Sequence, residues 1–298
     1  MPTNLAASVR ARLLAKAKVL GENFDFVLRR YGVECVLRRL AQSPARDRFV
    51  LKGAMLFVAW TGRISRPTRD LDFLGVGAAD ADHLRETFRE LCGMDVPDGI
   101  DFADGHFAIE PISEAGEYGG VRLRFEGRLD GARVPVQVDI GFGDDVVPGP
   151  EVVEFPSLIG FPGIRVQAYP REAMVAEKLH AIVTLGDGNS RMKDFHDIIH
   201  ISETHSFDGS RLSQALAATF RRRATVVLAA TTSAPPFYAD PVRSSRWQAF
   251  HSKLETPAVP SEFGEVGERV RRFLEPVMEA VEHGGAFDKQ WPPGGPWA

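Results

Sequence analysis

The stretch RPTRDLDFLGV, Arg66–Val76, decides how the rest of the chain is interpreted. Its second half alternates acidic and apolar residues, which is the period of a β-strand. Residues two apart in a strand point the same way, so Asp70 and Asp72 share one face. Leu71 and Phe73 take the other face. Two carboxylates on one face repel each other unless a cation lies between them. The pattern therefore indicates either a solvated strand end or a cation site.

A second strand carries a third carboxylate. In VPVQVDIGFGD, residues 134–144, valine, isoleucine and phenylalanine alternate along one face, and Asp139 lies on the opposite face with Gln137. In metal-assisted phosphoryl or nucleotidyl transfer, two carboxylates bridge two ions and a third holds the ion that activates the attacking hydroxyl. Mg²⁺ is the natural ion, with Mn²⁺ as the alternative, because it takes hard oxygen ligands and shares them with substrate phosphates. The competing interpretation is a surface aspartate on a half-exposed sheet.

Upstream, FVLKGAMLF places Gly53 at an expected turn into a helix. A glycine there lets phosphate oxygens approach backbone N–H groups. The motif indicates a phosphate site only in combination with its spacing to Asp70.

A lysine interrupts the apolar stripe of a later helix. In REAMVAEKLHAIVTL, Lys178 shares one helical row with Met174 and Ile182. A lysine is rarely buried without a partner, so Lys178 either extends to the edge of the stripe or directs its charge at a phosphate. In RMKDFHDI, Asp194 and Asp197 are one helical turn apart, and a buried aspartate here could hold Lys178 in place or fix a base. Alternatively, both are part of a charged helix start that favours the N-terminal end of the helix dipole.

Composition is that of a globular chain of 298 residues, with 44% apolar residues and a net charge of -4. No apolar run approaches the ~20 residues of a membrane span. Two cysteines without metal spacing favour a reducing cytoplasm. We expect an α/β domain with N-terminal helices over residues 1–160, a helical lobe over 161–285 and a flexible tail over 286–298.

Charge is unevenly distributed along the chain. Residues 1–66 hold 13 Lys+Arg against 4 Asp+Glu, whereas residues 67–160 hold 7 against 20. The basic section, or the later triplet 221–223, could contact a polyanion. The basic section includes the pairs Arg29-Arg30 and Arg38-Arg39. Solvated helix faces are the alternative explanation.

Five motifs occur in an order that resembles one family. They are FVLKGAMLF, RPTRDLDF, VQVDIGFGD, AEKLHAIV and RMKDFHDI. With the later RWQAFHSKL, they span about residues 25–255. Their order and spacing resemble the AbiEii/AbiGii-type nucleotidyltransferase toxins, a type IV-like toxin–antitoxin family that includes mycobacterial tRNA nucleotidyltransferase toxins.

The resemblance implies an α/β (α+β) fold with a DNA polymerase β-like nucleotidyltransferase core, a mixed sheet and a helical C-terminal lobe. It implies an enzyme of the EC 2.7.7 type that uses Mg²⁺ and an NTP. The expected reaction is transfer of NMP to an RNA acceptor, such as the tRNA 3' end, which blocks translation. The expected partners are that RNA and an antitoxin encoded nearby.

The resemblance also implies site residues. The metal ligands would be Asp70, Asp72 and Asp139, Lys178 would contact the triphosphate, and Asp194 would be an essential aspartate. The nucleotide-binding set would comprise Lys52, Gly53, Ala54, Thr68, Arg69 and Lys178. Relatives often carry Gly-Gly or Gly-Ser where this chain has Gly53-Ala54, so its grip on phosphate would differ.

Thr68 is a candidate regulatory phosphosite, because a phosphate there would repel both metal and triphosphate. The alternative is an ordinary threonine at a strand entry.

Two other functions fit the same motifs. One is the same fold acting on a small molecule or a protein hydroxyl, which suits the net acidity better. The other is a non-catalytic module that binds NTP or an antitoxin. The presence of all three carboxylates and the lysine argues against the non-catalytic module.

Overall fold

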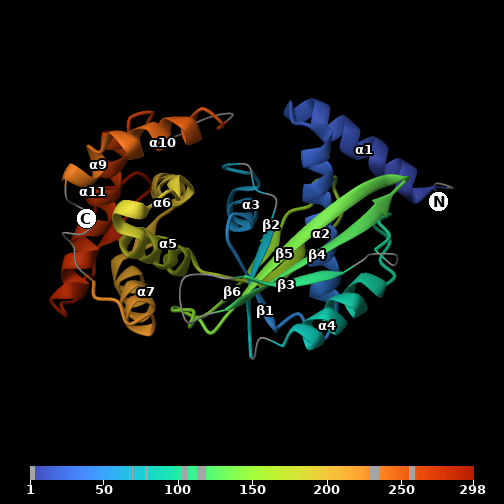
Figure 1. The fold of residues 1–298 in the computed structure, drawn as a ribbon, viewed down its shortest axis with the longest axis horizontal. Helices are drawn as coiled ribbons and strands as arrows, with labels where there is room; N and C mark the ends of the chain where they lie inside the picture. Colours follow the sequence, from blue (N-terminus) through green and yellow to red (C-terminus); the bar gives the residue numbers. More distant parts are fainter. Residues whose placement is uncertain are drawn as a thin grey trace. The chain divides into compact units, whose positions relative to one another are not determined.

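The computed structural model describes residues 4–66, 68, 70–77, 80–102, 107–112, 119–227, 235–254 and 259–298. Contacts divide the chain into two units, drawn in Figure 1. The sheet unit comprises Met1–Ile64, Thr68–Gly143 and Glu151–Ala168, and the helical unit comprises Ser65–Pro67, Asp144–Pro150 and Tyr169–Ala298. The division falls after Ala168, beyond the expected boundary at residue 160, because one more strand pair completes the sheet.

The sheet unit is built on a seven-stranded mixed sheet with the order β3-β4-β5-β2-β1-β7-β6. Its strands are β1 (Phe49–Lys52), β2 (Asp70–Gly75), β3 (Ala108–Ile112), β4 (Gly120–Leu129), β5 (Ala132–Phe142), β6 (Glu151–Phe155) and β7 (Ile164–Ala168). Its helices are α1 (Leu5–Leu20), α2 (Phe24–Gln42), α3 (Met55–Thr61) and α4 (Ala81–Gly93). Strand β2 runs antiparallel to β1 and parallel to β5. This arrangement confirms the α/β class with a mixed sheet.

One face of the sheet is apolar and covered. Along β5, alternate residues from Val134 to Phe142 are buried, and the residues between them are half-buried. Helix α2 contacts β5 and β7 (Figure 1). Aromatic side chains fill the interior beneath β1 and β2, where the ring of Phe49 lies 5.7 Å from Phe73 and 5.5 Å from Phe88. Each such ring stabilises the fold by roughly 1.5–3 kcal/mol when fully buried. The polar residues of β2 and β5 are thereby directed to the opposite face.

The helical unit packs its helices around a second apolar core. The helices are α5 (Arg171–Leu185), α6 (Met192–Thr204), α7 (Gly209–Arg222), α9 (Pro235–Tyr238), α10 (Pro241–His251) and α11 (Phe263–Glu282), with a 3₁₀ turn η1 (Gly186–Gly188). Helix α11 contacts α6, α7, α9 and α10, so it is the central support of this unit. Among the helices of the described ranges, none combines the length and the apolar character that crossing a bilayer requires.

The chain end is ordered, although its Pro and Gly content predicted a flexible tail over residues 286–298. A two-residue strand β9 (Gln290–Trp291) pairs with β8 (Phe207–Asp208). Trp291 is buried and donates its indole N–H to the Ser202 carbonyl. Trp297 stacks on Phe273, with ring centroids 5.8 Å apart. The two indoles anchor a segment that local composition alone would leave mobile.

Candidate active site

The polar face of the sheet begins with the paired aspartates of β2. Asp70 and Asp72 are half-buried, whereas Leu71 and Phe73 between and beyond them are buried. The alternation expected from the sequence is therefore present. The two carboxylates lie on the side of the sheet opposite the packed aromatic rings.

Strand register aligns charged residues from neighbouring strands across this face. Asp72 pairs with Lys52 of β1 on one side and with Asp139 of β5 on the other. Asp139 pairs in turn with Arg122 of β4, which pairs with Glu110 of β3. Registered partners on adjacent strands point to the same side of a sheet and lie about 5 Å apart. We call this five-residue line the charged row. In it, the neighbouring carboxylates of Asp72 and Asp139 lie between Lys52 on one side and Arg122 on the other.

Arg122 forms a forked ion pair with the third carboxylate. Its Nε donates to Asp139 Oδ1 at 2.7 Å, and its Nη2 donates to Asp139 Oδ2 at 2.6 Å. The hydrogen bonds to Asp139 raise the pKa of Arg122, and the charges of Asp139, Asp70 and Glu110 raise it further. The pair is partly open to solvent, with side-chain exposures of 30% for Arg122 and 16% for Asp139.

Gly53 sits directly against the carboxylate of Asp72. Its φ is +72°, which glycine adopts without strain. A Cβ at this position would lie 2.0 Å from Asp72 Oδ2. Only a residue without a side chain leaves room for that carboxylate between β1 and α3. Ala54 follows as the N-cap residue of α3.

Lys52 extends along the same face. Its Nζ lies 3.4 Å from the position that a Cβ on Gly141 would take. Gly141 is two residues beyond Asp139 in β5, so the lysine ammonium lies close to the carboxylates. The absence of a side chain at Gly141 provides its space.

The donor set of this face suits a hard divalent ion. Asp70 and Asp72 provide carboxylate oxygens on one side of one strand, and Gly53 has no side chain that would displace the Asp72 carboxylate. Mg²⁺ completes its shell with water and substrate phosphates, so it needs only one or two carboxylates from the protein. Within the described ranges, no three His, Cys, Asp or Glu side chains converge closely enough to form a metal cluster by themselves. The residues present therefore fit an ion that is shared with a phosphate ligand.

Two predicted nucleotide-binding residues lie in the segment before β2. Thr68 is half-buried and adjoins the carboxylate strand. Arg69 lies outside the described residues.

The helical unit holds the other predicted residues in a buried cluster. Lys178 of α5 forms ion pairs with Asp194 Oδ1 at 3.0 Å and with Asp197 Oδ2 at 2.7 Å, both from α6. Both aspartates have no exposed surface. Asp194 also accepts a hydrogen bond from Arg191 Nε at 2.7 Å. Asp194 therefore does hold Lys178 in place.

Asp197 is the centre of this cluster. Arg66 donates to both of its oxygens at 2.8 Å, and His196 Nδ1 lies 3.0 Å from Oδ1. Burial raises the pKa of Asp197, but Arg66 and Lys178 outweigh this and hold it well below its usual range. Burial lowers the pKa of Lys178, but the charges of Asp197 and Asp194 outweigh this effect and raise the pKa above its ordinary value. The ammonium of Lys178 is therefore held between two buried carboxylates.

Arg122 and Arg66 were not among the residues predicted for the site, whereas Asp197 was predicted with Asp194 as a possible partner of Lys178. The signal for Arg122 was available, because VRLRFEG places Arg122 and Arg124 opposite three buried residues of β4. No local signal identifies Arg66, whose partner lies 131 residues away.

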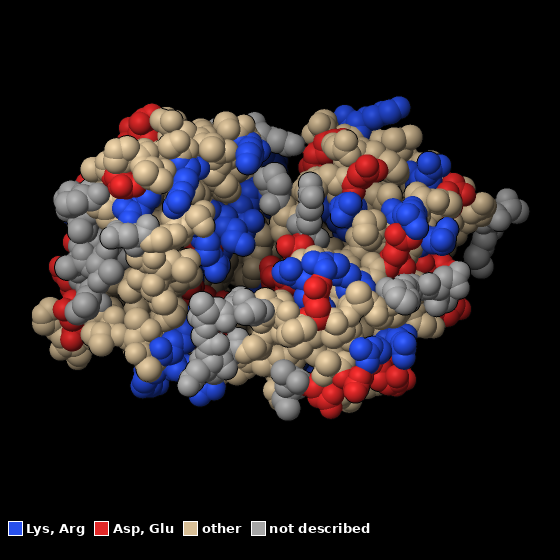
Figure 2. Space-filling view, in the orientation of Figure 1, with Lys and Arg blue, Asp and Glu red and all other residues tan. Residues whose placement is uncertain are grey.

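Of the two basic pairs expected to contact a polyanion, Arg38-Arg39 is wrongly placed for that role. Arg38 and Arg39 are buried, and Arg39 forms an ion pair with Asp98 inside the sheet unit. Arg223 is bound by Asp144, with distances of 3.0 and 3.1 Å. Exposed cations occur instead around the start of α6, at Arg191 and Lys193. Figure 2 shows lysine and arginine gathered over the part of the helical unit where α6 and α10 appear in Figure 1.

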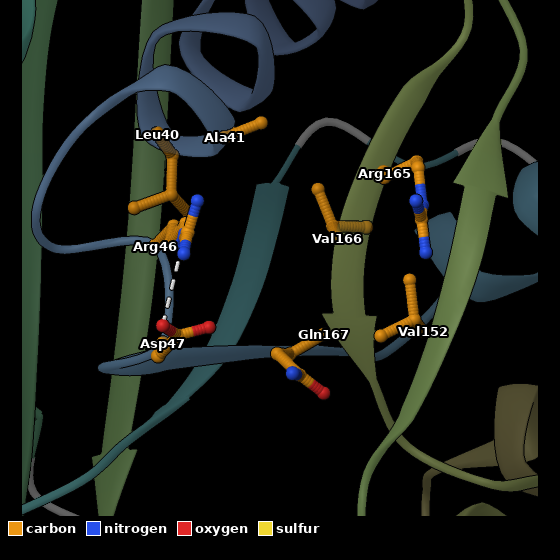
Figure 3. Close-up of a pocket in the computed structure, with 8 residues that line it drawn as sticks. All are labelled: Leu40, Ala41, Arg46, Asp47, Val152, Arg165, Val166 and Gln167. Atoms are coloured by element: carbon orange, nitrogen blue, oxygen red, sulfur yellow. Dashed lines mark hydrogen bonds and ion pairs between the residues drawn. The ribbon is translucent and has the colours of Figure 1, made fainter.

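A cavity of about 440 Å³ lies elsewhere in the sheet unit. Figure 3 shows Arg165 and Gln167 of β7, Val152 of β6 and Arg46 around it. None of the predicted site residues lines this cavity, so it is separate from the charged row.

The chain belongs to the family described as Nucleotidyl transferase AbiEii toxin, Type IV TA system, which matches residues 35–280. It is therefore a nucleotidyltransferase toxin of a toxin–antitoxin system, and its family implies an antitoxin partner.

The chain is also similar to solved structures. The chain is similar to MenT4, a nucleotidyltransferase toxin from Mycobacterium tuberculosis, with 16% identity, a TM-score of 0.52 and coverage of 93% of this chain and 89% of that one. It is also similar to JHP933 from Helicobacter pylori, with 15% identity, a TM-score of 0.46 and coverage of 85% and 89%. No curated protein sequence matches the chain. The first similarity confirms the fold, whereas the identity is too low to transfer a substrate.

Proposed function

We propose that the chain transfers NMP from an NTP to the 3' end of an RNA, with tRNA as the acceptor, in a Mg²⁺-dependent reaction in the cytoplasm. The observation that carries the proposal is the register of the charged row, which puts Asp139 of β5 beside Asp72 of β2. Family membership supplies the reaction class. Blocking of translation through modified tRNA would account for toxicity.

In this proposal Asp70 and Asp72 hold the divalent ion, and Asp139 is the third carboxylate. A divalent ion at this position neutralises phosphate charge and lowers the pKa of the attacking hydroxyl. Gly53 keeps the Asp72 carboxylate accessible. Lys178, with its charge secured by Asp194 and Asp197, is assigned to the triphosphate. Arg191 and Lys193 are exposed cations suited to phosphate contacts.

The test is incubation of the purified chain with total tRNA, Mg²⁺ and each labelled NTP separately. Label should appear on tRNA with one or two NTPs, and Asp70→Ala should abolish it without unfolding the chain. Asp47→Ala is the matched control, because Asp47 is an exposed aspartate of the same unit, paired only with the equally exposed Arg46. Label that persists in Asp70→Ala would remove the carboxylates from the mechanism.

A small-molecule or protein hydroxyl is the second candidate acceptor, favoured by the net charge of -4. Salt separates the two acceptors. RNA binding through several phosphate contacts weakens steeply as salt rises, whereas a small neutral acceptor would respond little.

The antitoxin acts either by contact or by modification, and we propose Thr68 as the modified residue. Its phosphate would add about two negative charges two residues before Asp70. Mass spectrometry of the chain after incubation with the antitoxin encoded beside it should find the phosphate at Thr68. An unmodified chain that is nevertheless inhibited would favour contact.

A further inference from the structure

We propose that Arg122 competes with the divalent ion for Asp139, so that loading the third carboxylate with metal requires this ion pair to open. The inference rests on the proposed metal-dependent function. Its basis is the fork in which Arg122 Nε and Nη2 engage both oxygens of Asp139 at 2.7 and 2.6 Å. An arginine that holds one oxygen would leave the other open, whereas this one occupies both.

The charges of the face make Arg122 a substitute for a metal ion. Three carboxylates share the face, and Arg122 donates to both oxygens of one of them, Asp139, its registered partner on β5. Arg122 therefore supplies positive charge where a divalent ion would otherwise be needed. A guanidinium and a divalent cation on the same carboxylate repel each other, because at a partly exposed site their interaction is only partly screened.

The pair is also placed so that it can open. Both side chains are partly exposed, at 30% and 16%, so that water can reach the groups when they separate. Glu110 is the cross-strand partner of Arg122 on β3, and it lies on the side away from Asp139. A released guanidinium could share the Glu110 carboxylate with Arg124, which is already paired with it, and its release does not require the core to open.

Arg124 provides a matched comparison on the same strand. It lies two residues from Arg122 on the same face, but it donates to Gln137 at 3.0 Å and forms an ion pair with Glu110. Neither partner is one of the three aspartates. Removing Arg124 therefore deletes an equal charge from the same strand without freeing Asp139.

The experiment measures Mn²⁺ binding to the full chain by electron paramagnetic resonance, without nucleotide or RNA. Arg122→Met should bind Mn²⁺ about tenfold more tightly than the unmodified chain, because one positive charge has left the carboxylate. Arg124→Met should change the affinity by less than about twofold, since its charge is more distant and more exposed. Asp139→Asn in the Arg122→Met background should reverse the gain. Circular dichroism of each variant confirms that it is folded.

The sign of the change separates the alternatives. If Arg122 instead orients Asp139 for the metal, Arg122→Met would bind Mn²⁺ more weakly, and if it is only a surface pair, the affinity would not change. Either result overturns the inference. A failure of both the unmodified chain and Arg122→Met to bind Mn²⁺ also overturns it.

The transfer assay distinguishes failure of the inference about Arg122 from failure of the proposed function. Label on tRNA that depends on Asp70, together with unchanged Mn²⁺ affinity in Arg122→Met, would remove only the inference. Tighter Mn²⁺ binding without transfer to any RNA would retain the inference and remove the proposed acceptor.

Discussion

Two ion-paired aspartates of this chain have opposite surroundings. Asp139 in the sheet unit forms its ion pair with one guanidinium at a partly exposed position. Asp197 in the helical unit has no exposed surface and is engaged by Arg66, Lys178 and His196. A half-exposed pair can open at low cost because water and ions replace the partner. A buried charge has no replacement, so its complete set of partners must stay together.

The comparison indicates different tasks for similar chemistry. The sheet unit leaves the Arg122–Asp139 pair partly exposed, which suits the ion-binding face proposed for it. The helical unit holds Lys178 between two buried carboxylates, which suits the phosphate contact proposed for it. The predictions below test whether that division holds.

The largest expected effect is on the buried aspartate. Asp197→Asn should lower the free energy of unfolding by about 3–5 kcal/mol, because it leaves Arg66 and Lys178 without their shared buried carboxylate. Asp139→Asn is the matched substitution at the half-exposed pair, and it should cost about 1 kcal/mol or less. Urea denaturation followed by circular dichroism measures both. Equal losses of unfolding free energy in the two variants would show that the buried and the half-exposed ion pairs do not differ in this way.

An intermediate effect is expected at the turn beside Asp72. Gly53→Ala should destabilise the chain by about 1–3 kcal/mol, since it combines a left-handed backbone with a Cβ 2.0 Å from the Asp72 carboxylate. It should also weaken Mn²⁺ binding, because the carboxylate must move.

Gly62→Ala is the control for this turn, because its φ of +71° matches Gly53 while a Cβ there would meet nothing within 4 Å. It should show the backbone cost alone, about 1 kcal/mol. If both variants bind Mn²⁺ equally well, the contact between Gly53 and Asp72 has no part in the site.

Local patterns predicted the parts of the site that depend on one element. The period of two placed Asp70 and Asp72 on a common face, and the interrupted helical stripe identified Lys178 as buried. The charged row required knowledge of which strands are neighbours and in which register, and this is decided by packing of the whole sheet. Arg66 and Asp197 meet for the same kind of reason, across 131 residues.

The chain end shows the limit of composition. Proline and glycine after residue 291 correctly exclude a helix, yet they do not determine whether the segment is ordered. Burial of Trp291 against Phe273 supplies the energy that orders it, with ring centroids 4.9 Å apart. That contact exists only once α11 is in place.

The last expected effect concerns pH, and it arises from a buried histidine of the helical unit. His180 of α5 is buried, with Nε2 2.9 Å from the Thr225 hydroxyl and Nδ1 3.3 Å from Arg223 Nη1. Burial, and then the charge of Arg223, lower its pKa from 6.5 to about 4. The folded chain therefore favours the neutral ring.

Its contribution to stability is complete above about pH 6.5 and declines as the pH falls toward about 4, because the unfolded chain binds the proton first. His180→Gln should flatten the dependence of the unfolding free energy on pH across that window. Exposed His283→Gln is the control for loss of an imidazole. Unchanged pH dependence in His180→Gln would assign the acid sensitivity to the carboxylates, and the buried cluster around Asp197 would then be the first place to look for it.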